Sequence, residues 1–171
     1  MLAGAACADC GRRDPVVFEF DHVESKRAGV AELVRSAAGR GRLLEEIARC
    51  EIVCANCHRR RTAARAGWYR LTGCPSATCS PQQSRNQAYL REVLAGSACR
   101  DCGERDAVVL EFDHRGEKRG NVSTMATWAS LATLRAEIAK CDVRCANCHR
   151  RRTQISLRSY RWAPVQSVAP P

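Results

Sequence analysis

The sequence predicts an α+β fold made of two small modules in tandem, joined by a flexible linker. A Cys-x-x-Cys-Gly segment and a Glu-Phe-Asp-His segment each recur at an offset of 92 residues, and a nine-residue Cys-Ala-Asn-Cys-His-Arg-Arg-Arg-Thr segment recurs at an offset of 91. Short β-branched and aromatic runs alternate with segments of helical spacing in each copy. The chain also has twelve cysteines in 171 residues. A core of about 60 residues usually needs a metal or a disulfide, so these cysteines are expected to complete it.

The repeat gives the expected domain boundaries. The first module covers residues 1–66, a linker with a lead-in helix covers 67–94, the second module covers 95–156, and a tail covers 157–171. The linker is expected to be irregular over residues 67–87, because it is rich in Gly, Pro, Ser and Gln. The tail is expected to be disordered, because proline and serine recur in it.

Five elements are expected in the first module. They are a strand at residues 16–20 that ends at Asp21-His22, a loop at 23–31, a helix with Leu43, Ile47 and Cys50 on one face, a strand at 51–53 and a helix at 55–65. Cys50 on that apolar face is expected to be a buried thiol.

The second module repeats this order after a short helix at residues 87–95. It has a strand at 108–112, a loop to residue 123, a helix with Leu134, Ile138 and Cys141 on one face, a strand at Val143 and a helix at 146–156.

The net charge of +10, from 28 Lys and Arg against 18 Asp and Glu, favours a polyanionic partner such as DNA. Only three of the 28 basic residues are lysines, and arginine suits bidentate phosphate contact. An arginine-rich surface without a specific partner is the alternative. The first 13 residues hold no signal-like apolar run, and no segment is long enough to cross a membrane. We therefore expect a cytoplasmic chain with reduced cysteines and no membrane partner.

Two cysteine quartets have the spacing of zinc sites. Each quartet consists of two Cys-x-x-Cys pairs: Cys7, Cys10, Cys54 and Cys57 in the first module, and Cys99, Cys102, Cys145 and Cys148 in the second. Two-residue gaps let one turn present two thiolates to the same ion. Two structural Zn²⁺ ions are therefore expected, and isolated redox-active or buried cysteines are the alternative. Cys74 and Cys79 in the linker lack two further ligands and are assigned no function.

All four histidines lie at equivalent positions of the repeat. His22 and His114 follow an aspartate at a strand end, whereas His58 and His149 follow the last cysteine of each quartet. Structural histidines, a spare zinc ligand or a haem attachment signature are the alternatives. The adjoining arginines and the second Cys-x-x-Cys pair disfavour haem.

Asp-His at a strand end, followed by Cys-x-x-Cys-His at the start of a helix, resembles the HNH endonuclease family, which has a ββα-metal fold with a structural zinc. The resemblance covers about residues 7–65 and 99–156. It implies that His22 and His114 are general bases. It also implies that a catalytic Mg²⁺ or other divalent cation is held in each module, by Asp21 with His58 and by Asp113 with His149.

The family has a further polar residue, usually Asn, that orients the base. Asn121 follows the base histidine in the second module, where the first module has Gly29. Asn56 and Asn147 lie inside the Cys-x-x-Cys turns, which is an unusual place for that role. The resemblance therefore assigns a catalytic role to Asn121 and makes the second module the stronger site.

Three consecutive arginines follow each helical histidine and are expected to bind nucleic-acid phosphates. They are Arg59, Arg60 and Arg61 in the first module and Arg150, Arg151 and Arg152 in the second. Phosphate contacts carry no base readout, so they predict no cleavage sequence.

The sequence is thus interpreted as a metal-dependent DNA endonuclease, a monomer with two sites. A non-catalytic zinc-stabilised DNA-binding protein is the main alternative. A redox or metal-storage protein would explain the cysteines but leave the histidines and arginines without a role.

Overall fold

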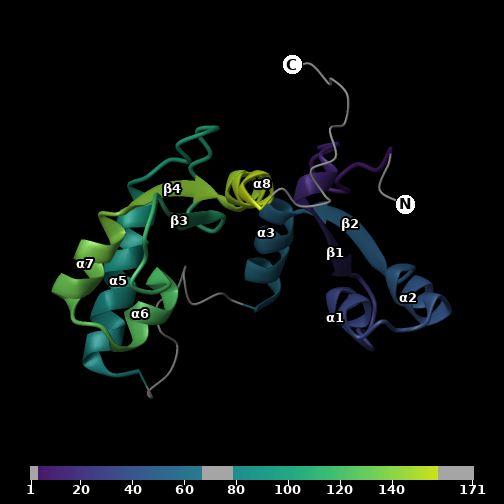
Figure 1. The fold of residues 1–171 in the computed structure, drawn as a ribbon, viewed down its shortest axis with the longest axis horizontal. Coiled ribbons are helices and arrows are strands. Elements are labelled where there is room, and N and C mark those ends of the chain that lie inside the picture. The colour runs from purple at the N-terminus through teal and green to yellow at the C-terminus, as the bar shows by residue number, and fades with distance from the viewer. Residues whose placement is uncertain (1–3, 67–78, 158–171) are drawn as a thin grey trace. The chain divides into compact units, whose positions relative to one another are not determined.

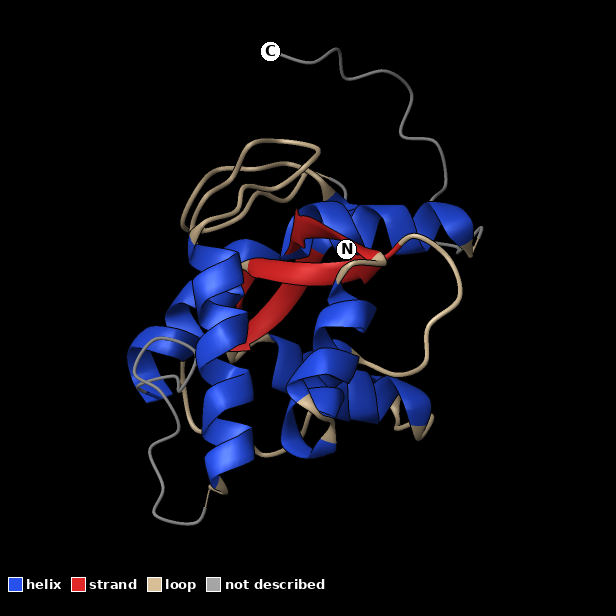
Figure 2. Ribbon diagram, turned by 90° about the vertical axis from the view of Figure 1, so that its left-hand side faces the viewer, coloured by secondary structure: helices blue, strands red, loops and turns tan. Residues whose placement is uncertain are grey.

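The computed structural model describes residues 4–66 and 79–157. Its contacts divide the chain into two compact units, and the boundary between them falls inside helix α3, after His58. Residues from Gln154 onward group with the first unit. Each unit contains one two-stranded antiparallel sheet, and helices form most of the rest (Figures 1 and 2). The expected α+β class is therefore confirmed, whereas the expected domain boundaries stay a prediction.

The hairpin of the first unit joins strands β1 (Phe18–His22) and β2 (Cys50–Cys54). Phe18 lies opposite Cys54 and His22 opposite Cys50, so one end of the hairpin carries the quartet residue Cys54 and the other end carries His22. A short 3-10 helix, η1 (Pro15–Val17), precedes β1. It takes up the two valines expected in the strand, because Asp14 accepts a hydrogen bond from the Val16 amide and starts a turn.

The first repeat has three α-helices besides its hairpin. Helices α1 (Val30–Arg35) and α2 (Arg40–Ile47) lie between the two strands in the sequence, and α3 (Ala55–Ala66) follows β2. Helix α3 matches the expected helix. Helix α1 begins at Val30, so it includes the last two residues of the loop that was expected at 23–31. The placement of Cys50 on a helix was wrong, because α2 ends at Ile47 and Cys50 opens β2. Its thiol is half-buried and donates to the Glu46 carbonyl at 3.3 Å.

The core of the first unit is built largely from its cysteines. Its buried cluster consists of Cys7, Val17, Phe18, Val53, Cys54 and Cys57. Three of these six residues belong to the cysteine quartet, so the sulfur atoms supply much of the apolar interior that so small a unit lacks.

The second repeat begins with the additional helix α5 and then has its strands and helices in the same order as the first. They are α5 (Pro81–Ala95), β3 (Leu110–His114), α6 (Val122–Trp128), α7 (Leu131–Ile138), β4 (Cys141–Cys145) and α8 (Ala146–Ser156). Strands β3 and β4 pair antiparallel, with Leu110 opposite Cys145 and His114 opposite Cys141. Cys141 therefore opens a strand as Cys50 does, which corrects its predicted place on a helix. Helix α6 lies where a loop was expected, and α8 has its predicted bounds.

Helix α5 begins earlier than expected and packs against α6 and α7 (Figure 1). Ser80 caps it by accepting from the Gln83 amide, and Pro81 occupies its first turn, so the irregular linker predicted to reach residue 87 ends before residue 81. Fully buried Asn86 donates to the carbonyls of Ala126 and Ala129, at the end of α6, at 3.2 and 2.8 Å. The predicted linker residues 67–78 and nearly all of the predicted tail lie outside the described residues.

No helix within the described ranges is long and apolar enough to cross a membrane.

Candidate metal centres and active site

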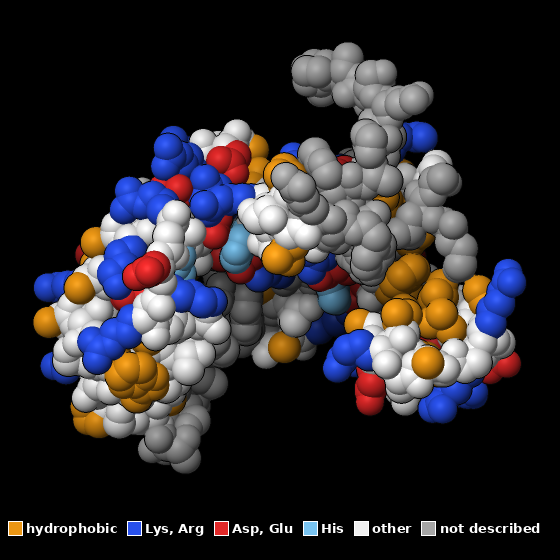
Figure 3. Space-filling model, in the orientation of Figure 1, with side chains coloured by type: hydrophobic (Ala, Val, Ile, Leu, Met, Phe, Trp, Pro, Cys, Tyr) orange, Lys and Arg blue, Asp and Glu red, His pale blue; other side chains and the backbone are white. Residues whose placement is uncertain are grey.

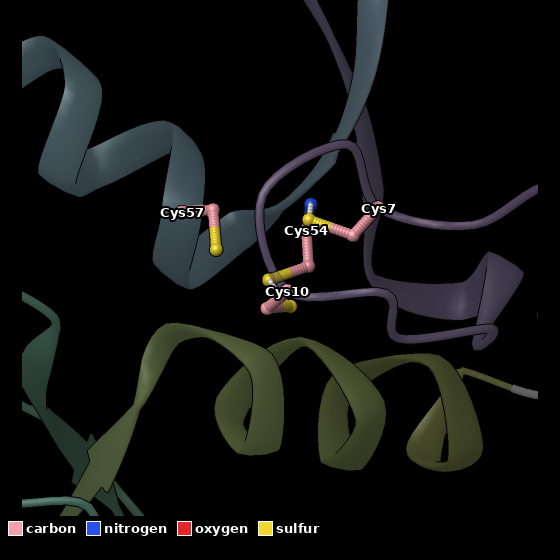
Figure 4. Close-up of side chains that lie close together, drawn as sticks. All are labelled: Cys7, Cys10, Cys54 and Cys57. Carbon is pink, nitrogen blue, oxygen red and sulfur yellow. Dashed lines mark hydrogen bonds between the residues drawn. The ribbon is translucent and has the colours of Figure 1, made fainter.

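The first cysteine quartet draws its four thiols from three elements. Cys7 and Cys10 come from the N-terminal loop, Cys54 ends β2, and Cys57 lies in the first turn of α3 (Figure 4). The four sulfur atoms lie within 4.8 Å of one another, and those of Cys10 and Cys54 are 3.8 Å apart. A tetrahedral zinc with Zn–S bonds of about 2.3 Å separates its sulfurs by about 3.8 Å. This group can therefore hold a zinc ion, as the spacing predicted.

The second quartet has the same construction. Cys99, Cys102, Cys145 and Cys148 also converge within 4.8 Å, with 3.7 Å between the sulfurs of Cys102 and Cys145. Among the described residues, these quartets are the two groups of three or more potential ligands that converge in this way. Four cysteines lie outside the quartets: Cys50 and Cys141 open β2 and β4, Cys79 is disulfide-bonded, and Cys74 lies outside the described residues.

A tight turn in the backbone presents each first pair of thiols. Gly11 and Gly103 follow the second cysteine with φ of 69° and 76°, a conformation that residues with a Cβ rarely adopt. The Gly11 amide donates to the Cys7 carbonyl at 2.9 Å, and Gly103 donates to Cys99 at the same distance. The glycine after each Cys-x-x-Cys pair thus closes the loop around the metal position.

The surroundings of the thiols favour a cation at the centre of each quartet. Burial opposes ionisation of Cys7, yet backbone amides, including that of Cys54 at 3.2 Å, lower its pKa to about 7. Burial and the neighbouring thiol of Cys54 raise the pKa of Cys57. In the second quartet, the hydrogen bond with Cys145 and burial raise the pKa of Cys148. In such a quartet the first thiolate forms readily, but each further thiolate would be repelled by its negative charge. A bound Zn²⁺ would offset this repulsion between the thiolates.

Next to each quartet, an imidazole from the helix meets a carboxylate from the hairpin. His58 Nε2 lies 3.3 Å from Asp21 Oδ1, and His149 Nε2 lies 3.5 Å from Asp113 Oδ1. A divalent ion with ligand bonds of about 2.0–2.2 Å joins a nitrogen and an oxygen about 3 to 3.5 Å apart. Both predicted pairs are therefore brought together at a separation that one ion could bridge.

A second carboxylate on the same strand face holds each of these imidazoles from its other side. Glu19 Oε2 lies 2.5 Å from His58 Nδ1, and Glu111 Oε2 lies 3.3 Å from His149 Nδ1. The hydrogen bond that His149 donates to Glu111 raises the pKa of His149, against the effect of burial. The sequence analysis missed both glutamates. Each glutamate lies two residues before the aspartate in the sequence, and residues i and i+2 of a strand face the same side. This spacing could have predicted that the glutamates lie beside the aspartates.

The two predicted base histidines lie on the opposite face of the hairpin and contact a glutamate. His22 Nε2 is 2.8 Å from Glu46 Oε1, and His114 Nε2 is 2.9 Å from Glu137 Oε1. Both glutamates are buried near the ends of α2 and α7. The sequence analysis missed them as well. Glu46 and Glu137 lie 91 residues apart, each four residues before a cysteine that the repeat also duplicates, Cys50 and Cys141. This recurrence could have identified them as candidate site residues.

Both glutamates are held in the ionised form. Backbone amides, led by that of Ala28, lower the pKa of Glu46. The ammonium of Lys140 and the amide of Arg119 lower the pKa of Glu137 to about 2. An ionised carboxylate can only accept, so the histidine Nε2 must carry a hydrogen, and in the neutral imidazole the lone pair is then on Nδ1.

Asn121 occupies a different place from the one its predicted role requires. It precedes α6, is exposed, and its Oδ1 accepts from the Lys118 ammonium at 3.2 Å. The side chain that contacts His114 is Glu137, so a catalytic role for Asn121 stays a prediction.

The arginine runs lie among acidic side chains. Within the second unit, Arg59 pairs with Glu111 at 2.8 Å, and Arg60 pairs with Glu104 and Asp106, each at 2.7 Å. Arg152 lies 2.5 Å from Asp113. Figure 3 shows basic side chains gathered over β3 and β4, with acidic side chains and a histidine between them. Phosphate binding by the six arginines stays a prediction.

Comparisons with protein families, with curated proteins and with solved structures find no match to this chain.

Proposed function

We propose that the chain is a zinc-stabilised, divalent-metal-dependent endonuclease of the HNH type that hydrolyses DNA phosphodiester bonds. One observation carries the proposal: beside each cysteine quartet, a helical histidine and a hairpin aspartate lie 3.3 and 3.5 Å apart. A protein that used zinc only to fold would have no need to repeat this pair, or to buttress each imidazole with a glutamate.

Asp21 and His58 would hold one divalent ion in the first unit, and Asp113 and His149 are the equivalent residues in the second. The ion would neutralise the charge that develops on the phosphate during cleavage. Glu19 accepts from Nδ1 of His58 and so leaves Nε2 unprotonated and directed at Asp21.

His22 acts as the general base through its Nδ1. Glu46 fixes the Nε2–H tautomer, so the lone pair on Nδ1 is available to take a proton from the attacking water. Asp21 and His22 face opposite sides of β1 but are consecutive residues at its end. A phosphate lying across this strand end is therefore the substrate position that the proposal requires.

DNA is the proposed substrate because the chain is strongly basic and three consecutive arginines follow each helical histidine in the sequence. Phosphate contacts of this kind favour binding without regard to base sequence.

The test is nicking of supercoiled plasmid by zinc-loaded full-length protein, with Mg²⁺ either present or omitted. Omission is preferable to EDTA, because a chelator could also remove the zinc. We expect cleavage with Mg²⁺ and a loss of about 10²–10⁴-fold in the His22→Ala/His114→Ala protein. Duplex binding, followed by gel shift, should be unchanged in that variant. Binding by the wild type without cleavage would contradict the proposal and support a zinc-stabilised DNA-binding protein instead.

A further inference from the structure

The two candidate ion sites share their carboxylates but differ in the cations around them. The acidic positions are paired across the repeat as Asp9 with Asp101, Glu19 with Glu111, Asp21 with Asp113, and Glu51 with Asp142. Three other equivalent positions carry Ala8, Val23 and Val53 in the first repeat and Arg100, Arg115 and Arg144 in the second. Every one of these three differences adds a guanidinium to the second repeat.

Arg144 is the most consequential of the three. It faces Glu111 across the hairpin, as Val53 faces Glu19. Its Nη1 lies 2.9 Å from Asp113 Oδ2 and 3.1 Å from Asp142 Oδ2, and its Nε lies 2.8 Å from Asp101 Oδ2. Its side chain is only 10% exposed, so solvent screens this cation weakly.

Arg100 and Arg115 act at longer range and from the surface. Both pair with Asp142 Oδ1, at 2.7 and 4.0 Å, and both side chains are more than half exposed. They reinforce Arg144 by neutralising a carboxylate that it also contacts, but water screens their own effect on Asp113.

Asp113 is therefore engaged by two arginines on one oxygen. Arg152 Nη1 joins Arg144 Nη1 at Oδ2, and Oδ1 is the oxygen that faces His149. Arg152 has an arginine counterpart, Arg61, in the first repeat, whereas Arg144 has valine. A divalent ion on Asp113 would have to sit within a few ångströms of a fixed buried cation, which costs more than tenfold in affinity even at an effective dielectric constant of about 20.

We propose that only the first unit binds the catalytic divalent ion, and that in the second unit the guanidinium of Arg144 takes the place of that ion. This inference rests on the assignment of an ion to the aspartate–histidine pair under the proposed function. It reverses the ranking expected from Asn121, and it makes the chain an enzyme that cuts one strand at a time. The second unit then keeps its structural zinc but has no catalytic ion.

Manganese binding tests this without requiring activity. Zinc-loaded protein is titrated with Mn²⁺, free Mn²⁺ is followed by electron paramagnetic resonance, and zinc content confirms two ions per chain in every variant. We expect one Mn²⁺ per wild-type chain, none for Asp21→Asn, and one for Asp113→Asn. Arg144→Val, which installs the residue of the first repeat, should add a second Mn²⁺. Arg144→Met keeps a similar stem and serves where Arg144→Val loses zinc.

Two Mn²⁺ ions per wild-type chain, loss of the ion in Asp113→Asn, or no gain in either Arg144 variant would overturn the inference. Nicking is measured on the same samples. One Mn²⁺ at the first unit without any cleavage would contradict the endonuclease proposal and leave the inference standing.

Discussion

The two units hold the same site residues in nearly the same geometry within different surroundings. The histidine–aspartate separations are 3.3 and 3.5 Å, and the histidine–glutamate separations are 2.8 and 2.9 Å. In the second unit α5 covers α6, and Ala126 is 1% exposed, whereas the equivalent Val34 in the first unit is 58% exposed. The comparison teaches that the hairpin, the cysteine quartet, the helix after it and the helix that carries the buried glutamate set the site without a counterpart of α5.

Breaking one quartet at a time is the change with the largest expected effect. Cys57→Ser and Cys148→Ser should each remove one of two zinc ions and unfold the surrounding unit, because structural zinc contributes about 10–16 kcal/mol to such sites. Zinc content and far-ultraviolet circular dichroism measure the loss. Cys50→Ser and Cys141→Ser are matched controls outside the quartets and should keep both ions. A Cys57→Ser protein with two bound zinc ions would contradict the assignment of the first quartet.

Neutralising the buried glutamates should have a smaller effect that sharpens the comparison. Glu46→Gln removes the charge that fixes the tautomer of His22, and we expect plasmid nicking to fall about 10- to 100-fold. Glu137→Gln should change nicking little, because the second unit is the one without the catalytic ion. Thermal unfolding of both proteins separates a loss of activity from a loss of fold. Equal losses of nicking in the two variants would count against the difference between the units.

Removing the contact between α5 and α6 should have the smallest effect and spare the site. Asn86→Ala removes two hydrogen bonds to α6 carbonyls from a buried position, and we expect about 1–3 kcal/mol of destabilisation. Gln82→Ala loses bonds to Trp128 and Ala129 from a more exposed position and should cost less. Chemical denaturation measures both, and nicking should be unchanged. Loss of nicking in Asn86→Ala would show that α5 does more than stabilise.

Sequence reasoning succeeded where the signal was local or duplicated. The Cys-x-x-Cys spacing predicted the two quartets. The alanine- and arginine-rich segments that begin at the last Cys-x-x-Cys pair of each repeat predicted the bounds of α3 and α8. It failed where a short turn competed with strand propensity, because the Asp14-Pro15 pair starts the 3-10 helix η1, which includes two valines that were expected in the strand. It also failed at the end of α2, because the helical spacing of apolar residues continues to Cys50 whereas the helix ends at Ile47.

Local sequence patterns could not predict the long-range contacts of the two sites. Glu46 meets His22 across 24 positions, and Arg144 meets Asp113 across 31. Only the strand register and the placement of α2 fix these distances, and neither follows from residue spacing. The exchange of Val53 for Arg144 was visible in the repeat, but its meaning depends on Arg144 pointing at Asp113.

The central claim is that His58 and Asp21 together hold a divalent ion, and pulsed electron paramagnetic resonance of bound Mn²⁺ tests it most directly. A histidine ligand gives a nitrogen coupling in that spectrum. The account predicts a coupling that disappears in His58→Ala and persists in His149→Ala. A spectrum without nitrogen coupling, or a coupling unaffected by His58→Ala, would contradict it.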